Sequence, residues 1–192
     1  MARNRIRGRD FFNLPNILTY LRITAIPLMI VLLVPPVTSF DYNMAFLICF
    51  LATLTDYIDG IIARRHNQVT PIGKLMDPLA DKLLVSAVFI MLIPLKKMQA
   101  WVTFLIISRE MLITGLRALA ASHGLVIQAS RSGKNKMVSQ SIAMLLLLLH
   151  IPAVERPLFY LGQGFVWVSI FFGYWSAGRY LVVFYWEMRK KP

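Results

Sequence analysis

The chain has 192 residues, of which 57% are hydrophobic and only 16% are charged, with a mean hydropathy of +0.61. This composition is too apolar for an ordinary soluble domain. The formal net charge of +12 would suggest a nucleic-acid partner in a soluble protein. Here the basic residues lie mostly between apolar runs, so membrane topology and anionic lipid explain them better. We therefore expect no nucleic-acid partner and one all-α integral membrane domain spanning residues 1–192, with a soluble helical core as the alternative.

Several apolar runs along the chain are long enough to cross a bilayer, which takes about 20 residues. A basic segment, residues 1–13, precedes them and is expected to be cytoplasmic or interfacial. Lys and Arg cluster in this segment, around 64–82, around 131–136 and in the C-terminal tail, whereas the intervening loops carry few. Both termini are therefore expected in the cytoplasm. The pattern predicts six transmembrane helices, at about 15–34, 42–64, 71–95, 100–121, 132–150 and 158–185.

Four of the nine acidic residues fall within one short stretch, at Asp56, Asp59, Asp77 and Asp81. Within each pair the spacing is three or four residues, which places both carboxylates on one helix face. Carboxylates beside hydrocarbon usually face a cavity, a partner or an ion, and four close together cannot all stay ionised without cations. All-oxygen ligands favour Mg²⁺ or Mn²⁺. The alternative is an interfacial ion network with the neighbouring arginines and lysines.

This stretch also resembles the signature of the CDP-alcohol phosphatidyltransferase family, D-x-x-D-G-x-x-A-R-x(8)-G-x-x-x-D-x-x-x-D. The matching residues are Asp56, Asp59, Gly60, Ala63, Arg64, Gly73, Asp77 and Asp81. The resemblance implies the CDP-alcohol phosphotransferase fold and a homodimer in a bacterial inner membrane, with the active site facing the cytoplasm. It further implies two Mg²⁺ or Mn²⁺ ions on the four Asp residues, and Asp81 as general base. The CDP group would lie on Asp56, Asp59, Gly60, Ala63, Arg64 and Gly73.

The start of the first apolar run, Pro15-Asn16-x-x-Thr19-x-x-Arg22, resembles the bacterial phosphatidylglycerophosphate synthases within this family. That resemblance implies that Asn16 and Thr19 contribute to the CDP site. The alternative is that these residues cap the helix while Arg22 extends its charged group to the membrane surface.

Charged residues deep in the fourth predicted span imply an internal partner or a polar cavity. Their R-E…L-R pattern, and the G-K-x-K…Q pattern after it, resemble the same synthases. A phosphate-bearing alcohol would need such a cationic pocket, which favours sn-glycerol 3-phosphate as acceptor and CDP-diacylglycerol as donor. The alternative is that these cations neutralise the Asp site, bind lipid headgroups or set topology. The predicted acceptor-phosphate residues are Arg109, Arg117, Arg131, Lys134 and Lys136.

Other functions share some of these features. The Asp motif is equally compatible with inositol phosphate, serine or phosphatidylglycerol as acceptor. A divalent-cation transporter would also need carboxylates, but would place them near mid-membrane, whereas these lie toward the cytoplasmic ends of their predicted spans. A non-catalytic membrane scaffold would not need the complete Asp set.

Overall fold

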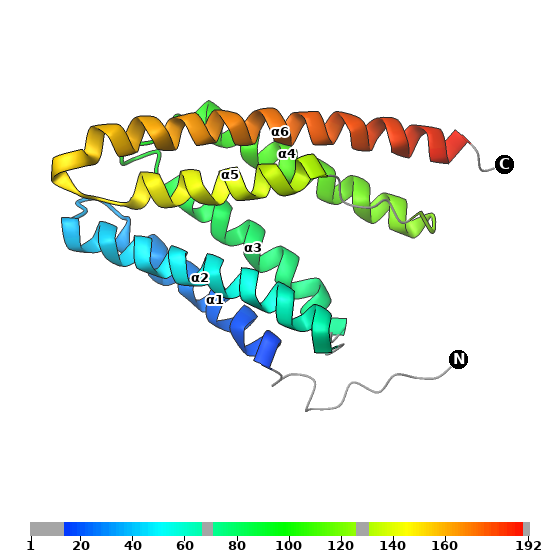
Figure 1. The fold of residues 1–192 in the computed structure, drawn as a ribbon, viewed down its shortest axis with the longest axis horizontal. Coiled ribbons are helices and arrows are strands. Elements are labelled where there is room, and N and C mark those ends of the chain that lie inside the picture. The colour runs from blue at the N-terminus through cyan, green and yellow to red at the C-terminus, as the bar shows by residue number, and fades with distance from the viewer. Residues whose placement is uncertain (1–13, 67–70, 126–130, 190–192) are drawn as a thin grey trace. The chain divides into compact units, whose positions relative to one another are not determined.

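A computed structural model describes residues 14–66, 71–125 and 131–189, although the side chains of 14–18, 56–66, 71–75, 77–78 and 131–132 lie outside that description. The described residues contain six α-helices and one short 3₁₀ helix, which confirms the predicted all-α fold. The chain divides into two compact units, Met1–Met91 and Leu92–Pro192. The helices are drawn in Figure 1.

In the first unit, helix α1 (Leu14–Leu32) packs against both α2 (Ser39–His66) and α3 (Pro71–Met91). One face of α1 is buried, and the spacing of its residues follows the helical repeat. Cys49 of α2 is also fully buried, and its Sγ lies 3.1 Å from Met29 Sδ. The buried residues of α1 are Thr19, Arg22, Met29 and, just past its end, Leu33.

Helix α2 begins with a reciprocal cap between Thr38 and Asp41. Asp41 Oδ2 accepts hydrogen bonds from the Thr38 backbone N–H (2.8 Å) and hydroxyl (2.7 Å), and the Asp41 N–H points back to Thr38 Oγ1 (3.3 Å). This arrangement satisfies N–H groups that have no partner within the helix. The bond from the Thr38 hydroxyl, and then that from its N–H, lower the pKa of Asp41.

This cap predicts a pH-dependent contribution to stability. Because the folded-state pKa of Asp41 is depressed, its contribution is complete above the unfolded value of about 3.9 and is lost as pH falls through the folded value. Thr38→Val should therefore lower the unfolding temperature at neutral pH, and the difference from wild type should shrink in acid. Thermal unfolding in detergent at a series of pH values measures this. An equal difference at every pH would contradict it.

In the second unit, α5 (Arg131–Leu148) runs antiparallel to α6 (Glu155–Arg189), and α4 (Ala100–Ser122) also packs on α6 (Figure 1). The short helix η2 (Pro152–Val154) precedes α6. Buried residues recur every three or four positions on one face of α6, and four of the six are Gly or Ser, which lets neighbouring helices approach closely. The buried residues of that face are Gly162, Val166, Ser169, Gly173, Ser176 and Tyr180.

Helix α4 ends in a left-handed glycine. Gly124 has φ 67°, its N–H bonds to Ala121 O (2.9 Å), and the next N–H, of Leu125, bonds to Ala120 O (2.9 Å). This pair of bonds is the Schellman arrangement, which favours glycine at the position with positive φ.

Gly162 provides a sharp test of the contact between α5 and α6. A Cβ atom there would lie 2.9 Å from both Cγ and Cδ2 of the buried Leu147, whereas one at Gly164 would have no such neighbour within 4 Å. Gly162→Ala should therefore lower stability by about 1–3 kcal/mol through overpacking. Gly164→Ala should be neutral or gain up to about 1 kcal/mol from helix propensity. Detergent thermal unfolding of the two variants should separate them, and equal unfolding temperatures would contradict this packing.

The membrane topology is supported in part. Within the described ranges, one helical stretch, Pro152–Arg189, is long and apolar enough to cross a bilayer. Thr19–Leu32 and Ser39–Thr55 are shorter apolar helices. The six-span topology with cytoplasmic termini stays a prediction.

Candidate active site

In the first unit, the Asp motif falls on two consecutive helices. Asp56 and Asp59 lie in the C-terminal part of α2, and Asp77 and Asp81 lie in the first half of α3. Four residues connect His66 to Pro71, so the two joined helix ends are separated by at most about 18 Å. Both helices also pack on α1, so the two halves of the motif belong to the same compact unit.

The helical rise places the carboxylates at matched distances from the joined ends. At about 1.5 Å per residue, Asp59 lies about 10 Å along the axis from the end of α2, and Asp77 about 9 Å from the start of α3. Asp56 and Asp81 each lie about 15 Å from those same ends. Each helix therefore carries one Asp about 10 Å and another about 15 Å from the joined end. A donor set of four carboxylates suits hard divalent cations.

Most side chains of this motif lie outside the described residues, so their contacts stay predictions. Asp81 is described and is partly buried, beside the fully buried Ala80. No cluster of three or more potential metal ligands occurs among the described side chains. The predicted site residues outside this description are Asn16, Asp56, Asp59, Gly60, Ala63, Arg64, Gly73, Asp77 and Arg131.

Helix α1 contributes two buried polar side chains to the same unit. Thr19 is 2% exposed and Arg22 is 4% exposed, and Arg22 Nε makes no hydrogen bond. The idea that Arg22 extends to the membrane surface is therefore wrong, because its side chain is held inside the protein. A buried guanidinium is costly unless anionic or polar groups compensate it. Position alone could not reveal this, since an arginine about two turns from a helix start can point either way.

The second unit contains a buried ion cluster formed by Arg109, Glu110 and Lys136. Glu110 Oε1 accepts from Arg109 Nη1 at 2.8 Å and from Lys136 Nζ at 2.6 Å. Arg109 Nε donates to the Gly173 carbonyl oxygen of α6 at 3.0 Å. The three side chains are 9%, 16% and 12% exposed. The predicted internal partner for these charges is confirmed, and the cluster joins α4, α5 and α6.

One carboxylate faces two cations in this cluster, so the group keeps a formal charge of +1. The cavity beside it is only about 10 Å³, roughly the volume for one water centre. Of the other predicted acceptor residues, the two whose side chains are described, Arg117 and Lys134, are not in this cluster. Arg117 is exposed, with its guanidinium 5.8 Å from the centre of the Tyr180 ring, and Lys134 is exposed.

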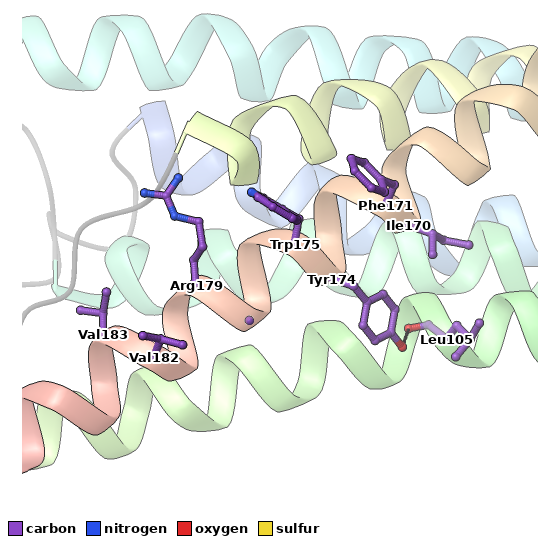
Figure 2. A pocket seen from close by; sticks show the side chains of 9 residues that line it. Leu105, Ile170, Phe171, Tyr174, Trp175, Arg179, Val182 and Val183 are labelled. Atoms are coloured by element: carbon purple, nitrogen blue, oxygen red, sulfur yellow. Dashed lines mark hydrogen bonds between the residues drawn. The ribbon is translucent and has the colours of Figure 1, made fainter.

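The second unit also has an open groove of about 800 Å³ along α6, shown in Figure 2. Its walls are almost entirely apolar, and Arg179 is the charged residue in its lining. Tyr174 donates from its hydroxyl to the Leu105 carbonyl oxygen at 3.2 Å. Such a groove suits hydrocarbon and does not suit a small anionic acceptor. The lining residues are Leu105, Ile170, Phe171, Tyr174, Trp175, Gly178, Arg179, Val182 and Val183.

Comparison with known proteins identifies the class to which this fold and motif belong. The sequence profile of the CDP-alcohol phosphatidyltransferase family matches residues 12–175. The chain therefore belongs to the CDP-alcohol phosphatidyltransferase family.

Several curated relatives carry the name CDP-diacylglycerol–glycerol-3-phosphate 3-phosphatidyltransferase. The Bacillus subtilis protein is 40% identical over 183 residues, covering 88% of this chain and 93% of the relative. The Rickettsia typhi protein is 39% identical over 162 residues, covering 83% and 89%. The Pseudomonas fluorescens protein is 33% identical over 175 residues, covering 88% of each. The family predicted from the motif is confirmed.

Proposed function

We propose that this chain transfers the phosphatidyl group of CDP-diacylglycerol to sn-glycerol 3-phosphate, giving phosphatidylglycerophosphate and CMP. The observation that carries the proposal is the complete Asp motif on α2 and α3, in a chain similar over most of its length to relatives bearing that activity in their names. The reaction belongs to anionic phospholipid biosynthesis.

The chemistry is a displacement at phosphorus. The acceptor hydroxyl oxygen forms a bond to the phosphorus that carries diacylglycerol, the diphosphate bridge breaks, and CMP leaves with the bridging oxygen. The carboxylate of Asp81 accepts the hydroxyl proton. Asp56, Asp59, Asp77 and Asp81 would hold two Mg²⁺ or Mn²⁺ ions, which would neutralise the diphosphate when bound. Asn16, Thr19, Gly60, Ala63, Arg64 and Gly73 would hold the CDP group.

The acceptor's phosphate needs a cationic partner. The surplus charge of the Arg109–Glu110–Lys136 cluster supports this role, and Arg117, Arg131 and Lys134 would add to the local potential. Because Glu110 already engages two of these cations, we expect it to set their positions before the substrate arrives. A planar guanidinium and an ammonium together suit a phosphate.

The protein would act in the bacterial inner membrane, with six spans, cytoplasmic termini and a cytoplasm-facing site. The many exposed large apolar side chains support a lipid environment, since soluble monomers rarely expose extensive apolar patches. Examples on α4 and α6 are Phe104 (69% exposed), Met111 (70%) and Phe171 (63%). The apolar groove of α6 would accommodate acyl chains. A homodimer is expected from the family.

An acceptor panel tests this function. The purified protein in detergent, with CDP-diacylglycerol and Mg²⁺ or Mn²⁺, should release CMP with glycerol 3-phosphate and far less with serine, inositol phosphate or phosphatidylglycerol. Preferential release with another acceptor would retain the reaction class and overturn the proposed substrate. No release with any acceptor, from folded protein, would overturn the proposal.

A further inference from the structure

Gln140 is a buried polar residue for which the proposed reaction has no role so far. It lies on α5, four residues after Lys136, so the two side chains share a helix face about 6 Å apart along the axis. Gln140 is 3% exposed, and its Nε2 is buried without a hydrogen-bond partner. The residues that follow on this side of α5, Ala143 and Met144, are buried and apolar.

A buried amide donor without a partner is unusual, because buried polar groups in native proteins are nearly always hydrogen-bonded. Leaving one unpaired costs more than replacing it with an apolar side chain of the same shape. If the side chain at position 140 only filled the space next to Met144, leucine or methionine would be sufficient. The amide is therefore better explained by a partner that arrives with a ligand.

We propose that Gln140 Nε2 donates a hydrogen bond to an oxygen on the glycerol unit of a bound substrate, and so determines substrate specificity. This inference rests on the proposed function. Lys136 lies one turn nearer the start of α5, so a phosphate near Lys136 would place a three-carbon backbone within reach of Gln140. The oxygen has two possible sources, the C2 hydroxyl of glycerol 3-phosphate and an ester carbonyl of the diacylglycerol group.

A site that hydrogen-bonds a substrate oxygen discriminates against the analogue lacking it, because a polar group of the site is then left unpaired. Wild-type protein is compared with Gln140→Met, which removes the amide at similar volume. One arm replaces glycerol 3-phosphate with 3-hydroxypropyl phosphate, which lacks the C2 hydroxyl. The other arm replaces CDP-diacylglycerol with its ether-linked dialkyl analogue, which lacks the ester carbonyls.

For wild type we expect kcat/KM to fall by about 10- to 100-fold with one of the two analogues. With CDP-diacylglycerol and glycerol 3-phosphate, the kcat/KM of Gln140→Met should be about 10- to 100-fold below that of wild type. Replacing the natural substrate with that same analogue should then lower the kcat/KM of Gln140→Met no further. The arm that responds identifies the oxygen. The discrimination between natural substrate and analogue is a ratio measured within one preparation, so this ratio does not depend on the fraction of protein that folds.

Gln163→Met is the matched control, because Gln163 Nε2 donates to Lys97 O at 2.7 Å and is assigned no substrate contact. It should discriminate as wild type does. Equal discrimination by wild type and Gln140→Met in both arms, or none by wild type in either, would overturn the inference while leaving the proposed function intact. Wild-type protein that releases no CMP with glycerol 3-phosphate would overturn both.

Discussion

Asp81→Asn should lower kcat for CMP release by about 10²- to 10⁴-fold, the usual contribution of a general base. Asparagine has nearly the same shape but cannot accept the acceptor's proton. Because Asp81 is only partly buried, the unfolding temperature should change little. Initial rates of CMP release, measured with saturating CDP-diacylglycerol and glycerol 3-phosphate, test the prediction.

Asp41→Asn is the matched control for this experiment. Asp41 is partly buried and accepts the capping bonds at the start of α2, and the amide oxygen of asparagine can still accept a hydrogen bond. Asp41→Asn also replaces a carboxylate with an amide, but outside the motif, and should leave kcat near the wild-type value. Comparable rates for Asp81→Asn and Asp41→Asn would remove Asp81 from the catalytic step.

Glu110→Gln should give the largest loss of stability among the described side chains. It removes the charge that compensates Arg109 and Lys136, and a buried pair broken on one side typically costs about 3–5 kcal/mol. This cluster is a buried ion pair of that kind, because its distances are 2.6 and 2.8 Å and all three side chains have low exposure. Thermal unfolding in detergent would measure the loss as a lower unfolding temperature.

A rescue variant separates charge imbalance from lost packing. Adding Lys136→Met to Glu110→Gln removes one uncompensated cation and should recover part of the unfolding temperature. The half-exposed Glu155, paired with Lys97 Nζ at 3.4 Å, provides a comparison, since exposed pairs contribute about 1 kcal/mol or less. If Glu110→Gln were no more destabilising than Glu155→Gln, or if Lys136→Met deepened the loss, the cluster would not be an electrostatic unit.

The helices themselves could be predicted well from the sequence, because long apolar runs separated by Pro, Gly and basic segments leave few other options. Their ends were less accurate. Helix α3 stops at Met91, four residues before the predicted end, and the Lys97 and Met98 N–H groups bond back to Leu92 O. Helix α6 starts three residues earlier and ends four later than predicted. Its acidic first turn and its basic last turn, with Glu155 and Arg189, both suit the helix dipole.

The motif could be predicted because its spacing is local, whereas the partners of the buried charges could not. Glu110 and Lys136 are 26 positions apart, and nothing in either segment indicates that α5 brings the ammonium onto that carboxylate. The burial of Arg22 and Gln140 likewise depends on how helices pack. Sequence periodicity fixes which residues share a face, but tertiary contacts determine which faces become interior.

The most direct test of the proposed function follows both products of one reaction. Purified protein is incubated in mixed micelles with CDP-diacylglycerol, a divalent cation and glycerol 3-phosphate labelled in its carbon chain. We predict equal amounts of CMP and of labelled phosphatidylglycerophosphate in the lipid phase, with neither formed in a chelator. CMP without labelled lipid would mean hydrolysis of the donor, and would contradict transfer to glycerol 3-phosphate.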